Sequence, residues 1–197
     1  MKKIFCWILL VCHFLLMSVS FAQDYSHLDP DGLVPKNLLS EALNFYQQNQ
    51  AKIQNPKLMG IIDFKAHNSK ERFFLIDMES GFVETYLTAH GKNSDPDFDG
   101  YATKFSNVDG SLMSSLGFYL TAESYYGSNG YSLRLDGLSS TNSNARARAI
   151  VIHGADYVSP GGKIGRSFGC PALEDRYHQD VIDRLKGGTL LFAGLGN

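Results

Sequence analysis

The sequence predicts a mainly β fold, a β-sandwich or open barrel, with an N-terminal helix and short peripheral helices. Short runs rich in β-branched and aromatic residues fill the chain after residue 57, and Gly, Asn, Asp and Ser separate them. Strands do not alternate with long helices, which argues against a doubly wound parallel sheet. The expected strands cover residues 58–66, 72–78, 82–89, 117–125, 131–135, 147–153 and 189–193.

Two segments have the pattern of helices instead. Between residues 35 and 54 apolar side chains recur at intervals of three and four, and Pro56 closes the segment. Residues 177–186 carry an apolar stripe that ends before two glycines. We therefore expect a lead-in and helix over residues 23–57 and a main domain over residues 58–197.

The first 22 residues have the features of a secretory signal peptide. A basic start precedes an apolar run, and Ser20 and Ala22 place small side chains at the positions that a signal peptidase reads. The run of about 14 residues is shorter than the roughly 20 that a membrane-spanning helix needs. We expect cleavage after Ala22 and a soluble protein in the periplasm or secreted.

The composition of the full chain argues against two classes of protein. The 197 residues are 44% hydrophobic and 19% charged, with a formal net charge of -2. A nucleic-acid binder or a disordered chain would need a skewed charge or fewer apolar residues. Roughly 175 residues remain after cleavage, which is enough to bury a core without disulfides.

The cysteines direct attention to one residue. Cys6 and Cys12 lie in the signal segment, so the mature chain keeps only Cys170. A lipid anchor on Cys12 is disfavoured because β-branched Val11 stands where lipoprotein signals carry a small residue. An unpaired thiol in an oxidising compartment is a liability unless it is buried or has a chemical role.

A histidine and this cysteine form the strongest chemical motif. His153-Gly154 ends an apolar strand, and Ser167-Phe168-Gly169-Cys170 follows after a glycine-rich stretch. An imidazole can accept the thiol proton, and the N–H groups of Gly169 and Cys170 can stabilise an oxyanion. A carboxylate, an amide or a backbone carbonyl could orient the imidazole. Taken singly, each residue is more often structural; together they favour nucleophilic catalysis.

These residues resemble the signature of the L,D-transpeptidases, cysteine enzymes that remodel bacterial peptidoglycan. The sequence from Gly165 to Leu173 is similar to the branch called the murein L,D-transpeptidase catalytic domain family. Residues 89–91, 105–107, 114–117 and 130–135 also look alike, so the resemblance runs from about residue 58 to residue 192. It implies a mainly β catalytic domain of that type.

The resemblance also implies roles for individual residues. Cys170 would form a thioester with a stem peptide, His153 would accept its proton, and the Gly154 carbonyl would orient the imidazole. Ser167 and Gly169 would shape the loop and the oxyanion site. The expected activity is release of terminal D-alanine and acyl transfer to an amine, which could belong to another stem or to a protein lysine.

Two departures from the family pattern concern substrate binding. Phe168 stands where many members have a second histidine, and Pro171 follows the cysteine in a stretch without the usual arginine. Arg166 is the expected replacement for that cation, with Phe168 beside it. His90, which also precedes a glycine, is a further candidate for substrate contact.

Other candidates carry weaker signals. Arg134, Arg146 and Arg148 could clamp acidic stems or lie on a solvated face. The acidic segment 95–100 resembles the start of a calcium loop but has Ser106 in place of the distal glutamate. No zinc motif is present, so we expect neither a metal nor a cofactor. The alternatives to transpeptidation are hydrolysis of the same stems or peptidoglycan binding without catalysis.

Overall fold

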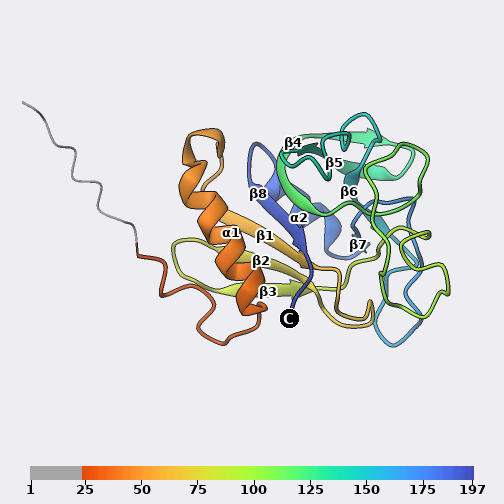
Figure 1. Ribbon diagram of the computed structural model, residues 1–197, viewed down its shortest axis with the longest axis horizontal. Helices are drawn as coiled ribbons and strands as arrows, with labels where there is room; N and C mark the ends of the chain where they lie inside the picture. The colour runs from red at the N-terminus through yellow and green to blue at the C-terminus, as the bar shows by residue number, and fades with distance from the viewer. Residues whose placement is uncertain (1–23) are drawn as a thin grey trace, which may run out of the picture.

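The computed structural model describes residues 24–197, so the expected signal peptide lies outside the described residues. Within this part of the chain, one eight-stranded mixed sheet curls around a core, with strand order β3-β2-β1-β8-β4-β5-β6-β7 (Figure 1). The mainly β prediction is therefore confirmed. The elements are α1 (Lys36–Gln48), β1 (Leu58–Asp63), β2 (Phe73–Asp77), β3 (Val83–Tyr86), β4 (Gly117–Gly127), β5 (Gly130–Gly137), β6 (Val151–Ala155), β7 (Ala172–Glu174), α2 (His178–Leu185) and β8 (Leu190–Gly194).

The two helices cover opposite faces of the sheet. Leu38, Ala42 and Tyr46 recur every four residues along α1 and pack on one face of β1, β2 and β8. On the other face, α2 buries its apolar stripe in the curl of the sheet. Both faces of β1 are thus covered, which explains why all of its residues are buried.

Apart from shifts of one to three residues at the ends of other elements, the expected elements differ from the observed ones at three places. The first helix ends at Gln48, and a 3-10 turn at Gln50–Lys52 follows, because the chain leaves the helical conformation at Asn49. The strand expected at 147–153 begins only at Val151, because the preceding residues form turns and Ala149 has a φ of 53°. Strand β7 was not predicted, since three residues are too few to show a period.

Two long loops meet at one end of the sheet (Figure 1). Residues 87–116 connect β3 to β4, and residues 156–171 connect β6 to β7. A parallel bridge joins Gly91 to Ser167, and the N–H of Lys92 donates to the Ser167 carbonyl at 2.8 Å. This end of the sheet carries both His153 and Cys170.

Candidate active site

Adjacent strands bring His153 and Cys170 together. In the parallel pair of β6 and β7, His153 is opposite Ala172, and Cys170 lies two residues before Ala172. Both side chains line one cavity of about 220 Å³, which we call the Cys170 pocket. Its lining residues are Asn129, His153, Tyr157, Arg166, Ser167, Phe168 and Cys170.

The surroundings of His153 select one form of its imidazole. The ring is 5% exposed, and Nδ1 lies 2.8 Å from the Gly154 carbonyl oxygen. Because a carbonyl only accepts, Nδ1 carries the proton and Nε2 keeps its lone pair in the neutral ring. Burial lowers the pKa of His153, which favours this neutral form.

The Cys170 thiol is also held in its neutral form. Burial raises the pKa of the thiol, although the Val151 N–H and the charge of Arg148 act in the opposite direction. Sγ accepts from the Val151 N–H at 3.5 Å and donates to the Ala149 carbonyl at 3.6 Å. Both pKa shifts therefore favour a thiol and a neutral imidazole over a thiolate and an imidazolium.

Hydrogen bonds fix the loop that carries the cysteine. The Ser167 hydroxyl donates to the Cys170 carbonyl at 2.6 Å and accepts from the Gly169 N–H at 3.1 Å. Gly169 has a φ of 124°, and a Cβ there would lie 2.7 Å from the Met113 carbonyl oxygen. Only glycine fits this position. The Gly169 N–H is thus already bonded, whereas the Cys170 N–H has no acceptor among residues 24–197.

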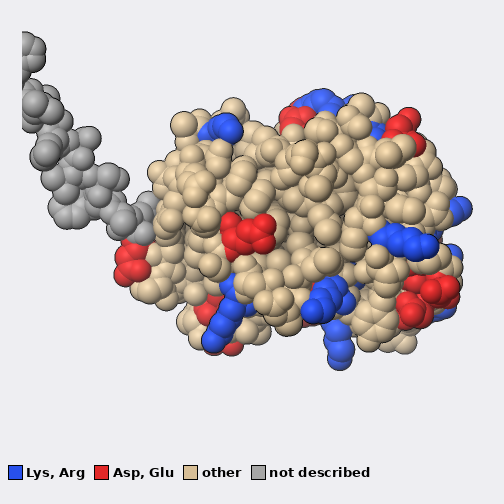
Figure 2. Space-filling model, viewed as in Figure 1, with Lys and Arg blue, Asp and Glu red and all other residues tan. Residues whose placement is uncertain are grey.

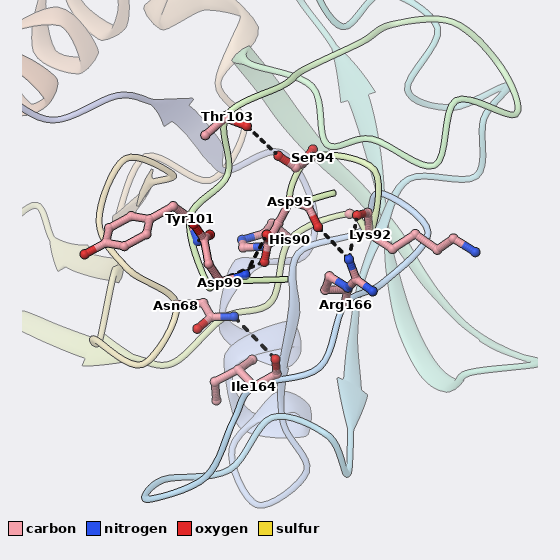
Figure 3. Close-up of polar contacts among 12 residues, drawn as sticks. Asn68, His90, Lys92, Ser94, Asp95, Asp99, Tyr101, Thr103, Ile164 and Arg166 are labelled. Carbon is pink, nitrogen blue, oxygen red and sulfur yellow. Dashed lines mark hydrogen bonds and ion pairs between the residues drawn. The ribbon is translucent and has the colours of Figure 1, made fainter. Parts of the chain in front are cut away.

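Arg166 and Phe168 form the rim of the pocket. The Arg166 guanidinium donates through one nitrogen to the carbonyls of Lys92 and Asp95, at 3.2 and 2.5 Å (Figure 3). It also lies 4.0 Å from the centre of the Phe98 ring. Its other N–H groups have no acceptor among the described residues. Phe168 is 70% exposed, with the Lys92 ammonium 5.6 Å from its ring centre.

His90 lies outside the Cys170 pocket, in a buried cluster with Arg72 and Asp95. Its Nδ1 accepts from Arg72 at 2.8 Å, and its Nε2 is 3.3 Å from the Asp95 carboxylate, near the Arg166 site in Figure 3. All three side chains have at most 1% exposure. Burial and the Arg72 charge lower the pKa of His90 to about 4, and burial lowers that of Arg72 to about 9.

The backbone of His90 nevertheless supports the pocket. Its carbonyl accepts from the Ser167 N–H at 2.9 Å. Asp95 in turn accepts from the N–H groups of Asp99 and Gly100, both at 3.0 Å, which folds the acidic segment into a turn. Within residues 24–197, no group of three or more His, Cys, Asp or Glu side chains is placed to hold a metal ion.

The three further arginines that the sequence singled out, Arg134, Arg146 and Arg148, do not line the pocket. Arg134 and Arg146 pair with Glu123 on the strand surface. Arg148 donates to the carbonyls of Ser106 and Met113, both at 2.6 Å, and so holds the 105–115 segment beneath the cysteine loop. Its pattern in the sequence did not distinguish it from the solvated arginines.

One face of the molecule carries no broad patch of a single charge sign. On the face shown in Figure 2, basic and acidic side chains are interspersed, and much of the surface carries neither. No helix among residues 24–197 is long and apolar enough to cross a membrane.

The fold and the site define a mainly β domain with a cysteine and a histidine in one pocket at the end of its sheet. Residues 31–193 match the model of the L,D-transpeptidase catalytic domain, so the chain belongs to that family. Comparison with curated protein sequences gives no significant match.

Several solved structures resemble the chain at low identity. An L,D-transpeptidase from Mycobacterium smegmatis is 14% identical with a TM-score of 0.43, over 70% of this chain and 58% of that one. L,D-transpeptidase 3 from Mycobacterium tuberculosis is 12% identical with a TM-score of 0.46, over 71% and 61%. The helical cell shape determining protein Pgp2 from Campylobacter jejuni is 12% identical with a TM-score of 0.43, over 78% and 55%. The chain thus spans less than two thirds of each of these proteins.

Proposed function

We propose that this protein is an exported cysteine acyltransferase that acts on peptidoglycan stem peptides. The observation that carries the proposal is the Cys170 pocket, which is lined by an imidazole of fixed tautomer on β6 and by a thiol two residues before the adjacent strand β7. Membership of the L,D-transpeptidase catalytic domain family supports the same reaction. The signal-like N-terminus supports action outside the cytoplasm.

In the proposed reaction, proton transfer accompanies attack. The thiol turns from the Ala149 carbonyl and gives its proton to His153 Nε2 while Sγ bonds to the stem carbonyl carbon. The carbonyl π electrons move to oxygen and then re-form the double bond as the C–N bond breaks. The departing D-alanine amine takes the proton from Nε2, and a thioester remains on Cys170.

The second half of the cycle depends on the acceptor. An amine of another stem or of a protein lysine would attack the thioester, give a proton to His153 and regenerate the thiol. Water in place of the amine would make the enzyme a carboxypeptidase. With either acceptor, Arg166 first binds the terminal carboxylate of the donor stem, before D-alanine leaves, through its unbonded N–H groups. Phe168 packs on the stem.

Incubation of the mature protein with defined tetrapeptide muropeptides tests this proposal. Cross-linked products, or tripeptide products together with free D-alanine, are expected in the wild type and absent in Cys170→Ala. Product masses distinguish transfer from hydrolysis. Turnover by the alanine variant would contradict the proposal. So would absence of turnover by an untreated wild type that is folded and whose Cys170, in a separate sample, reacts with iodoacetamide.

A further inference from the structure

An oxyanion formed in the Cys170 pocket requires hydrogen-bond donors, and one of the expected donors is already engaged. The Gly169 N–H donates to the Ser167 hydroxyl, and the hydroxyl proton of Ser167 goes to the Cys170 carbonyl. The Cys170 N–H remains, but a single donor is an incomplete site, since oxyanions in acyl-transfer enzymes are generally bound by more than one. A second donor must come from another residue of the pocket.

Tyr157 has the properties of that donor. It lines the Cys170 pocket, and among residues 24–197 the structure shows no hydrogen bond of its hydroxyl. Tyr157 is partly buried. A tyrosine in such surroundings normally has a partner for its O–H, and here a ligand in the pocket would supply it.

The position of Tyr157 is fixed from two sides. The residue follows the end of β6 by two positions, and its ring packs against the apolar cluster that contains Ala155, Val158 and Ile164. Its carbonyl accepts from the Gly165 N–H at 2.9 Å. A Cβ on Gly165 would lie 2.7 Å from the Tyr157 Cβ, so glycine at this place lets the ring lie against the loop.

The ionisation of Tyr157 suits a donor. Burial, followed by the charge of Cys170, raises the pKa of the phenol to about 12. The hydroxyl therefore keeps its proton when the thiol loses its own. The influence of Cys170 on this pKa also agrees with the two side chains lining one cavity.

We propose that the Tyr157 hydroxyl is a catalytic residue that donates the second hydrogen bond to the oxyanion formed when Cys170 attacks a stem carbonyl. This inference rests on the proposed acyl-transfer function. Sγ bonds to the carbonyl carbon, the π electron pair moves to the carbonyl oxygen, and the O–H of Tyr157 and the N–H of Cys170 both donate to that oxygen. The phenol proton stays on Tyr157, and the two bonds are released when the thioester forms.

The test compares two reactions of the same thiol. Imipenem and a tetrapeptide muropeptide acylate Cys170 through an oxyanion, whereas iodoacetamide alkylates it by direct displacement without one. Tyr157→Phe removes only the hydroxyl and keeps the ring that packs on the loop. Tyr126→Phe is the matched control, because Tyr126 is 81% exposed and does not line the pocket.

We expect Tyr157→Phe to slow acylation by about 10²-fold, the usual effect of losing one oxyanion donor, with the rate of alkylation by iodoacetamide unchanged. Tyr126→Phe should match the wild type in both reactions. Equal acylation by Tyr157→Phe and the wild type would overturn the assignment of Tyr157 alone. Parallel loss of alkylation and acylation would assign the residue a structural role instead. A wild type whose Cys170 reacts with iodoacetamide but, in separate samples, with neither acyl donor would contradict the proposed function itself.

Discussion

Replacing Arg72 by methionine tests how the buried cluster supports the fold. The guanidinium has 0% exposure and donates to the carbonyls of Thr88 and Ala66 and to His90 Nδ1, at distances from 2.7 to 3.2 Å. Methionine keeps most of the apolar length of the side chain but leaves these three acceptors without their donor. The Thr88 carbonyl and His90 Nδ1 are buried, and a buried acceptor without a donor costs about 1–3 kcal/mol, whereas the Ala66 carbonyl is only partly buried. The lowered pKa of Arg72 shows that burying the cation is itself unfavourable, and its removal recovers part of that cost.

The balance predicts a loss of about 3–5 kcal/mol, because leaving these acceptors unpaired costs more than removing the buried cation recovers. A domain of this size has about 5–15 kcal/mol of stability, so the variant stays folded at 25 °C but unfolds at lower urea concentration. Arg146→Met is the control. Arg146 is 46% exposed and pairs with Glu123, which predicts a loss of about 0–1 kcal/mol. Equal urea midpoints for the two variants would refute the reasoning.

Three further predictions concern pH and substrate. Because the folded pKa of His90 is about 4 and the unfolded value about 6.5, the unfolded state binds more protons between these values. The free energy of unfolding therefore falls as pH drops from 6.5 to 4, by about 3 kcal/mol at 1.36 kcal/mol per pH unit. In urea titrations at several pH values, His90→Gln should reduce this dependence of stability on pH. An unchanged dependence would contradict the assignment of the effect to His90. Alkylation of Cys170 by iodoacetamide should be slow at pH 7 and accelerate above pH 9, since burial raises the pKa of the thiol. An alkylation rate that does not change with pH down to pH 6 would instead indicate a thiolate–imidazolium pair. Arg166→Gln should lower kcat/KM by about 10–100-fold for donors with a free terminal carboxylate, because a hydrogen bond to a charged group contributes about 1.5–3 kcal/mol. It should not lower kcat/KM for donors whose terminal carboxylate is amidated. Equal losses of kcat/KM for the two kinds of donor would exclude a carboxylate contact.

Local patterns in the sequence were sufficient for most of the fold. Short runs rich in β-branched and aromatic residues, separated by Gly, Asn, Asp and Ser, predicted the strands that became β1, β2, β4 and β8. The turn before β6 was missed because its residues look apolar enough for a strand, while Ala149 adopts a left-handed conformation that alanine rarely takes. No local pattern announces such a conformation.

Part of the candidate site was predictable from local sequence features. Cys170 and His153 stand out by residue type and by the glycines near them, whereas Tyr157 is one aromatic residue among many until the fold places it in the pocket. Arg72 in a strand-like run suggests a solvated face, and only long-range contacts show that it is buried against His90. Contacts between residues distant in sequence cannot be read from periodicity.

The measurement that tests the central claim most directly is the intact mass of the protein after brief incubation with a tetrapeptide stem or with imipenem. The account predicts a covalent adduct on Cys170, with the mass of the donor peptide less D-alanine or with the added mass of imipenem, and no adduct on Cys170→Ala. An adduct on the alanine variant, or a wild type that stays unmodified by both donors while iodoacetamide still reaches Cys170, would contradict it.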